Sequence, residues 1–185
     1  PMFLPWLGLF ELIDTADVFI FLDNFQFSKQ GWGQRNRILS NPDQTSFITI
    51  PVRRPEGLGS TFRDVFPNPD HRWLKKTCTN LQQVYGKMPY FSETFDLIEP
   101  HLSKFATKEK CLADLEIQLT KEIASHMGIN ADFHLSSDFN TDQFKRSERV
   151  LALIESVGGE IYYAAKGSVP YMRDDDIFTP RDSVY

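Results

Sequence analysis

The sequence has few of the residues and motifs that mark the commonest functional classes. Its only two cysteines, Cys78 and Cys111, form no CxxC pair, which disfavours a disulfide framework and favours free thiols in a reducing compartment. The chain contains no GxSxG, Walker A, GxGxxG or HExxH motif, so the usual signals of hydrolases, nucleotide-binding proteins and zinc proteases are missing. The four histidines have no second ligand at diagnostic spacing, and we expect no metal site.

Long apolar runs are also missing. No stretch reaches the roughly 18 to 20 apolar residues that a membrane span needs, and no basic segment followed by an apolar one opens the chain. We therefore expect a soluble, cytoplasmic protein without a membrane span. The sequence begins at Pro1 in the middle of an apolar run, and we expect both termini to be incomplete.

Positive charge is scarce overall but concentrated in one segment. The net charge of −5 disfavours a general attraction to nucleic acid or to anionic lipid. Residues 23–63 nevertheless hold six Lys or Arg against three Asp or Glu. This contrast predicts a local site for a small anionic ligand.

Composition and apolar periodicity predict an α/β fold. With 41% hydrophobic residues, including 16 Phe, the chain can bury a large core. We expect strands at 17–23, 47–52, 132–136 and 161–164, a loop at 24–37, and helices at 9–16, 69–86, 89–98, 108–127 and 145–157. The predicted architecture is Rossmann-like, with a mostly parallel sheet. It forms a single α/β domain over residues 1–185, with a helical subregion at about 69–127 packed beside the sheet.

Cations and small hydroxyls follow three of the predicted strands. In open parallel sheets, ligands bind beyond the carboxyl ends of the strands, so we expect these loops to lie together. Guanidinium and ammonium groups, backbone N–H groups at helix starts and a Trp ring suit an anionic ligand with a planar or sugar part. The candidate substrate-binding residues are Gln26, Lys29, Trp32, Arg35, Arg37, Arg146, Ser147, Lys166, Ser168 and Tyr171.

Each candidate also has a simpler interpretation. Lys29, Arg35 and Arg37 are equally typical of a solvated or salt-bridged loop. Asp23, at a strand end, is the candidate catalytic residue, because such positions often orient a hydroxyl or act in acid–base chemistry, yet an Asx turn cap is an alternative. Neighbouring cations would lower the pKa of a carboxylate there and so weaken it as a base.

Several segments together resemble the WbqC-like family of bacterial proteins. These are PMFLPWLGLF at 1–10, DNFQF at 23–27, GWGQRNRI at 31–38, ITIPV at 48–52, YGKMPYF at 85–91, RSER at 146–149 and GSVPYM at 167–172. The resemblance covers nearly the whole chain. It also places Trp6-Leu7-Gly8-Leu9 where nucleotidylyltransferase folds carry an HxGH motif, but both histidines are absent here, which argues against nucleotidyl transfer by that route.

The resemblance implies a role in bacterial surface polysaccharide (O-antigen) synthesis. In that setting the chain is expected to be a transferase that moves an acyl or aminoacyl group onto a nucleotide-linked amino sugar. The alternative is a non-catalytic module of the same pathway that binds a sugar nucleotide or a protein, which the lack of a nucleophile–base pair readable from the sequence favours. No cofactor is indicated by the sequence.

Overall fold

The chain divides into two compact units. The computed structural model describes residues 1–41, 43–55, 57–107, 110–178 and 183–184. Unit 1 comprises Pro1–Pro5 and Asp23–Met127, and unit 2 comprises Trp6–Leu22 and Gly128–Tyr185. In its described residues the chain is a mixed α/β protein with six α-helices and four two-stranded sheets. That residues 1–185 form a single domain stays a prediction.

Unit 1 combines two antiparallel strand pairs with three long helices, and the three helices fall within the predicted helical subregion. Its elements are β2 (Arg35–Asn41), β3 (Gln44–Thr49), β4 (Val52–Arg53), η1 (Gly57–Gly59), η2 (Phe62–Asp64), β5 (Phe66–Pro67), α2 (Arg72–Tyr85), α3 (Phe91–Thr107) and α4 (Leu112–His126). Strand β2 pairs with β3, and β4 pairs with β5.

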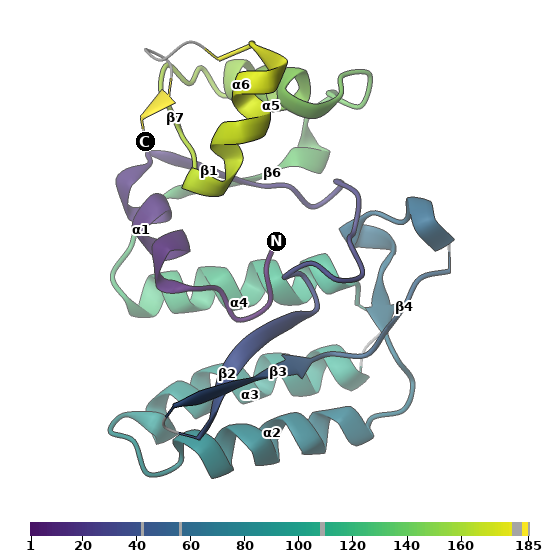
Figure 1. The fold of residues 1–185 in the computed structure, drawn as a ribbon, viewed down its shortest axis with the longest axis vertical. Helices are drawn as coiled ribbons and strands as arrows, with labels where there is room; N and C mark the ends of the chain where they lie inside the picture. The colour runs from purple at the N-terminus through teal and green to yellow at the C-terminus, as the bar shows by residue number, and fades with distance from the viewer. Residues whose placement is uncertain (42, 56, 108–109, 179–182, 185) are drawn as a thin grey trace. The chain divides into compact units, whose positions relative to one another are not determined.

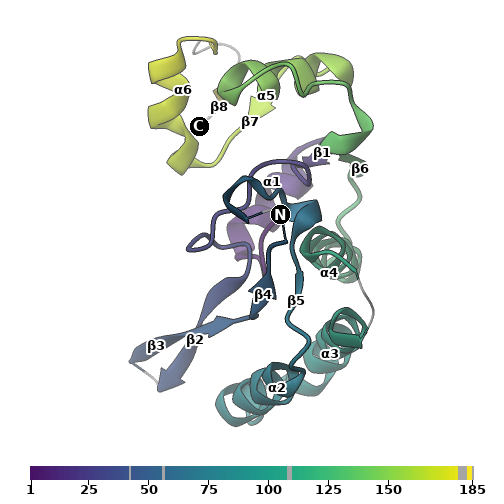
Figure 2. The same ribbon diagram turned by 90° about the vertical axis from the view of Figure 1, so that its right-hand side faces the viewer.

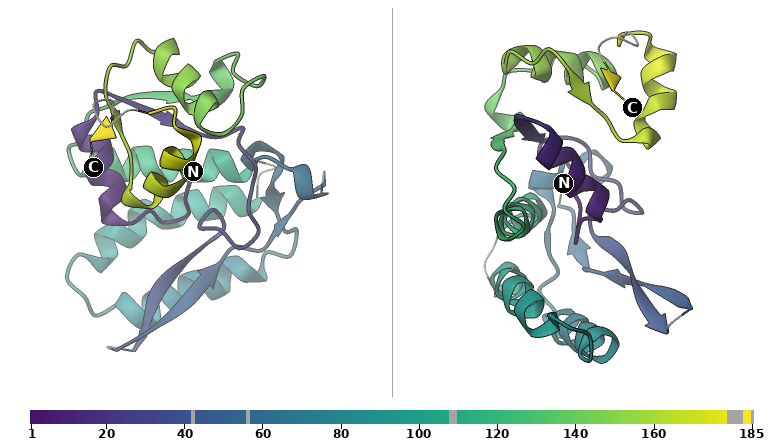
Figure 3. Two further views of the ribbon diagram at one scale, coloured as in Figure 1. Left: turned by 45° about the horizontal axis from the view of Figure 1, so that its top comes forward. Right: turned by 90° about the vertical axis from the view of Figure 1, so that its left-hand side faces the viewer.

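The core of unit 1 lies between a layer of helices and a layer of strands. Helices α2, α3 and α4 lie side by side in one layer, and the hairpin β2–β3 lies across from α2 and α3 (Figures 1 and 2). The right-hand panel of Figure 3 shows the same two layers from the opposite side. Ile38 and Ile48 of the hairpin belong to one buried cluster with Leu81 of α2, Leu102 of α3 and Leu119 of α4.

The hairpin corrects the predicted loop at 24–37, because β2 already begins at Arg35. Its sequence Arg35-Asn36-Arg37 shows no apolar alternation, so the usual sign of a half-buried strand is missing. Pairing with the more apolar β3 forms the strand instead. The predicted strand at 47–52 is likewise divided into β3 and β4, and Pro51, which has no N–H to donate, lies between them.

Helix α3 extends well beyond the predicted helix at 89–98. It runs from Phe91 to Thr107 with Pro100 inside it. An interior proline costs about 3 kcal/mol through its missing N–H and its ring clash. Beyond the proline, Leu102 and Phe105 are buried in the core of unit 1, and their burial offsets this cost.

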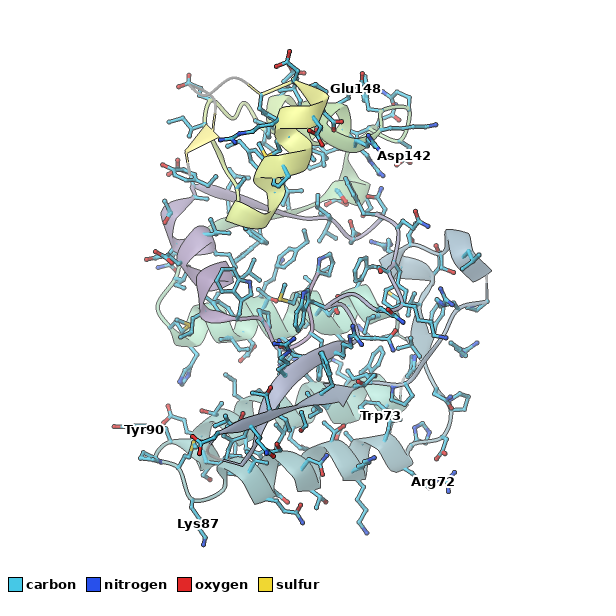
Figure 4. The ribbon with its side chains drawn as sticks, in the orientation of Figure 1. Arg72, Trp73, Lys87, Tyr90, Asp142 and Glu148 are labelled. Carbon is cyan, nitrogen blue, oxygen red and sulfur yellow. The ribbon has the colours of Figure 1, made fainter. Side chains whose placement is uncertain are left out.

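Two other helices of unit 1 agree well with the predictions. Helix α2 ends at Tyr85 with Gly86 as its C-cap, as predicted. Figure 4 shows Trp73 on the side of α2 that faces the core and Arg72 on its outer side. Helix α4 begins at Leu112; residues 108–109 of its predicted start lie outside the described residues. Across the described part of the chain, no helix has the length and apolar character that a membrane crossing requires.

Unit 2 contains the parallel strand pairs. Its elements are α1 (Leu7–Thr15), β1 (Val18–Phe21), β6 (Asp132–Leu135), η3 (Ser136–Asp138), α5 (Arg146–Ser156), β7 (Tyr162–Tyr163), η4 (Lys166–Ser168), α6 (Val169–Asp175) and β8 (Ser183–Val184). Strand β1 pairs with β6, and β7 pairs with β8, both in parallel. Within the described residues β6 and β7 are therefore not hydrogen-bonded to each other, and half of the strand pairs of the chain are antiparallel. This corrects the prediction of one mostly parallel sheet.

Phenylalanines hold the central strand pair of unit 2 together. Phe19 and Phe21 lie on the same face of β1, and Phe133 of β6 is in register with Phe19. The ring of Phe21 stacks on that of Phe133 with centroids 5.6 Å apart, and Phe19 meets Phe21 edge-on at 5.0 Å. Part of the unusual phenylalanine content therefore serves core packing.

Replacing Leu119 by Ala tests the core of unit 1. Leu119 is fully buried, so the substitution should lower the free energy of unfolding by about 2 to 5 kcal/mol, measured by urea denaturation. Leu58→Ala is the matched control: this leucine is 81% exposed, and its loss should change stability by less than about 0.5 kcal/mol. Equal effects of the two substitutions would contradict the assigned core.

Candidate ligand-binding site

The outward face of the hairpin in unit 1 carries two guanidinium groups and two aromatic rings. Arg35 and Arg37 are two residues apart in β2 and so share a face, and Phe47 of β3 is directly opposite Arg37. The Arg35 guanidinium carbon lies 4.5 Å from the centroid of Phe47, and that of Arg37 lies 5.8 Å from the centroid of Trp32. We call Trp32, Arg35, Arg37 and Phe47 the hairpin cluster.

Hydrogen bonds hold the hairpin cluster against the first residues of the chain. The N–H of Phe3 donates to the carbonyl of Trp32 at 3.0 Å, and the side-chain amide of Asn36 donates back to the carbonyl of Phe3 at 3.0 Å. Phe3 is fully buried. Since Asn36 lies between Arg35 and Arg37, these bonds fix the part of β2 that presents both guanidinium groups.

The hairpin cluster keeps unused binding capacity. Trp32 is 45% exposed and Phe47 is 49% exposed, so both rings remain accessible to solvent. Arg35 donates from Nη2 to the carbonyl of Gln30, while its buried Nε has no hydrogen-bond partner among the described residues. Guanidinium groups beside accessible rings suit a ligand that combines a phosphate or carboxylate with a planar or sugar part.

Two further predicted residues lie in the loop that leads to the hairpin. Lys29 is exposed, within a turn that the N–H of Gly31 closes by donating to the carbonyl of Ser28 at 3.0 Å. The side-chain amide of Gln26 already has a partner within the protein, since it donates a hydrogen bond to the carbonyl of Leu58 at 3.0 Å. Lys29 is therefore available to an anion, whereas the amide nitrogen of Gln26 ties two loops of unit 1 together.

Asp23, the predicted catalytic residue, is fully buried and forms an ion pair. Its carboxylate accepts a hydrogen bond from Arg63 at 2.5 Å. That bond raises the pKa of Arg63. The Asp23 carboxylate is therefore engaged in a buried ion pair rather than open to solvent.

Glu116 of α4 is a buried carboxyl group that the sequence analysis missed. It is fully buried, and neither carboxyl oxygen has a hydrogen-bond partner among the described residues. Burial raises its pKa well above the ordinary value of glutamate, because the charged form loses its hydration. A sequence signal existed: Glu116 stands between Leu115 and Ile117 in a helix whose residues are buried on several sides. A charge in such a setting is uncommon.

The other predicted residues belong to unit 2. There, the Ser147 hydroxyl donates to Asp175 of α6 at 2.6 Å, which lowers the pKa of Asp175, and the exposed Arg146 lies 3.5 Å from the same carboxylate. Ser168 lies at the end of η4, just before α6. Lys166 is in η4 and Tyr171 is in α6, but their side chains lie outside the described residues. That the predicted residues of the two units form one site stays a prediction.

Metal-ligating side chains do not gather in the described parts of the chain. No group of three or more His, Cys, Asp or Glu residues is placed there to hold a metal ion. His134 does have a partner, Asp132, two residues earlier on the same face of β6, at 2.9 Å. We therefore interpret His134 as one half of a local hydrogen-bonded pair with Asp132.

Comparison with known proteins assigns the family. The model of the WbqC-like protein family matches residues 1–182. The chain is also similar to the uncharacterized protein Rv1507c of Mycobacterium tuberculosis, with 28% identity over 177 residues, which cover 95% of this chain and 74% of that protein. No solved structure matches the chain.

Glu116→Gln tests the protonation of the buried carboxyl. Burial raises the pKa of Glu116 in the folded protein. At pH values just above about 4.3, the ordinary pKa of glutamate, the Glu116 carboxyl therefore loses its proton only in the unfolded state. Wild-type stability should therefore fall as pH rises from there towards the folded-state pKa, by up to about 1.4 kcal/mol per pH unit. Glutamine cannot ionise, so the variant does not lose stability in this way. The free energy of unfolding of Glu116→Gln, relative to that of the wild type, should therefore increase with pH.

The measurement is urea unfolding of both proteins at several pH values from 4 to 8. Glu122→Gln, at an exposed glutamate of the same helix, is the control and should show no such growing difference. If the difference in free energy of unfolding between Glu116→Gln and wild type did not change with pH, the pKa of Glu116 would not be raised in the folded protein.

Proposed function

The chain belongs to the WbqC-like protein family, and from this premise we propose that it is a transferase that binds a nucleotide-linked sugar through the hairpin cluster. The reaction belongs to the synthesis of bacterial surface polysaccharide, including O-antigen. An acyl or aminoacyl group passes to the amine of the sugar, so that a new amide bond replaces the bond between that group and its carrier.

The observation that carries the proposal is the pairing of guanidinium groups with accessible rings on the hairpin. Arg35 and Arg37 would hold the phosphates, with Lys29 as a further cation from the preceding loop. Trp32 and Phe47, with centroids 6.2 Å apart, offer faces on which a base or a sugar ring can stack.

Unit 2 supplies its own proposed contacts to an anionic group. In this proposal Arg146, Ser147, Lys166, Ser168 and Tyr171 belong to a Rossmann-like arrangement and contact the anionic group of a donor or of a sugar phosphate. We assign the activity to the cytoplasm, because Cys78 and Cys111 are both free thiols.

A non-catalytic sugar-nucleotide-binding module of the same pathway is the second candidate. The ion pair between Asp23 and Arg63 favours it, since the carboxylate predicted to be catalytic is fully buried and already engaged by a guanidinium. Both candidates require the hairpin cluster to bind the nucleotide sugar.

Arg35→Ala tests binding at the hairpin cluster. Loss of a charge-assisted hydrogen bond to phosphate should weaken the binding of UDP-glucosamine by about 1.5 to 3 kcal/mol, measured by calorimetry. Arg35→Lys keeps the charge but loses the planar fork of donors, and should recover only part of the affinity. Lys76→Ala removes an exposed cation from α2 and should leave affinity unchanged. Unchanged affinity in Arg35→Ala, with an unaltered melting temperature, would remove Arg35 from the site.

A mass measurement separates the transferase from the binding module. The full-length protein is incubated with UDP-linked amino sugars and a panel of acyl and aminoacyl donors, and the sugar nucleotides are then analysed by mass spectrometry. A transferase should increase the sugar mass by one acyl group, and Arg35→Ala should reduce the yield. Binding without a mass increase for any donor would favour the module.

A further inference from the structure

Strand β3 leaves one edge of the hairpin in unit 1 open. The N–H of Ile50 donates to the carbonyl of Gln34 at 2.8 Å, so these two residues form a hydrogen-bonded pair of the ladder. Bonded and non-bonded pairs alternate along antiparallel strands, and the backbone groups of Ser46 and Ile48 therefore face β2. The β3 residues whose N–H and C=O groups face away from β2 are Thr45, Phe47 and Thr49.

The opposite edge of the hairpin, along β2, is covered. The N–H of Leu39 donates to the hydroxyl of Tyr85 at 2.9 Å, and the N–H of Arg37 donates to the side-chain oxygen of Asn36 at 2.7 Å. The side-chain amide of Asn36 donates in turn to the carbonyl of Phe3 at 3.0 Å. The bulge in the ladder also lies in β2, so β3 stays regular. The hairpin thus has one covered edge and one open edge.

Strand β3 lacks the features that normally keep an edge strand from pairing. Such strands are usually protected by charged side chains, by proline or by a bulge. The residues Gln44–Thr49 include no charged residue and no proline, and all of them except Ile48 are exposed. Among the described residues no third strand pairs with β3 (Figure 2). The edge is therefore available to a further strand.

The open edge is complementary to itself. The residues that present their backbone groups outward, Thr45, Phe47 and Thr49, read the same in both directions. Antiparallel pairing with a second copy, about a two-fold axis at Phe47, places Thr45 opposite Thr49 of the other copy and the two Phe47 residues opposite each other. Aromatic pairs and Thr–Thr pairs across neighbouring strands are both favourable. This symmetry favours a second copy of the chain as the partner.

We propose that β3 is a dimerisation edge, through which two copies of this chain join their hairpins into one four-stranded antiparallel sheet. The inference goes beyond the proposed function and needs no ligand. Because the β2 edges are covered, pairing ends at two copies and does not continue into a fibre.

The positive charges of the two hairpins do not prevent this pairing. Three strand spacings, about 14 Å, would separate the β2 strand of one copy from that of the other. This distance exceeds the Debye length of about 8 Å at physiological ionic strength. Repulsion of Arg35 and Arg37 by their counterparts is therefore largely screened.

Sedimentation velocity tests the dimer. One strand pair buries a small area, so we expect a transient dimer that forms as the protein concentration rises from about 1 to 200 µM. Thr45→Lys/Thr49→Lys places like charges opposite each other across the interface and should raise the Kd by about tenfold or more. Thr45→Glu/Thr49→Lys shares the second substitution but places opposite charges there, and should restore dimerisation. Gln83→Lys, at an exposed position of α2, should dimerise as wild type.

Hydrogen exchange of the wild-type protein, followed by NMR, gives a second test that needs no variant. The N–H of Phe47 faces solvent in the monomer and a carbonyl of the other copy in the dimer, so its protection should rise with protein concentration. The N–H of Ser46 donates to β2 in both states and is the internal control. Equal behaviour of the two N–H groups would contradict pairing through β3.

The remaining outcomes are equally decisive. A protein that stays monomeric over the whole concentration range overturns the proposal and leaves the open edge to a strand of a different protein. A dimer that neither Thr45/Thr49 variant alters forms through another surface, which also overturns it. Circular dichroism and the melting temperature establish that the variants are folded, and the exchange measurement decides the matter if they are not.

Discussion

Placing carboxyl groups away from water is the constraint on which the interior of unit 1 depends. An ionised carboxylate inside a protein costs several kcal/mol unless a counter-ion and hydrogen bonds compensate. Asp23 is compensated by Arg63, whose side chain is still 48% exposed and so retains much of its hydration. Burial raises the pKa of Glu116 well above its ordinary value, which favours the neutral form. The same constraint therefore produces one carboxylate that a guanidinium balances and one carboxyl group whose pKa is raised.

The hairpin shows how packing determines the geometry of a surface. Side chains alternate between two faces along each strand, and Ile38 and Ile48 anchor one face in the core. Arg35, Arg37 and Phe47 are then placed on the opposite face, in register with one another. A slip of one residue would expose the isoleucines and bury the guanidinium groups, so the register is strongly determined. The spacing of the two cations is thus a consequence of the core beneath them.

Local patterns predicted the elements whose signals are local. Helix α2 and strands β1 and β6 match the predicted positions closely, since an amphipathic stripe or a short apolar run is enough to define them. The prediction fails where tertiary packing outweighs the local rule. Pro100 remains inside α3 because the residues after it are buried, and Arg35 begins a strand because a partner strand supplies the apolar face.

The candidate site residues show the same difference between features that depend on local sequence and features that depend on tertiary packing. Trp32, Arg35 and Arg37 were identified together because they are close in sequence, and the structure brings them together around Phe47. The partner of Asp23 is forty residues away, and Glu116 stands on a helix far along the chain, so neither environment can be read from one sequence. A strand end indicates where a catalytic carboxylate is commonly found, but its basicity depends on which charges surround it. Position in the sequence therefore pointed to Asp23, whereas the burial of both carboxyl groups became visible only in the folded chain.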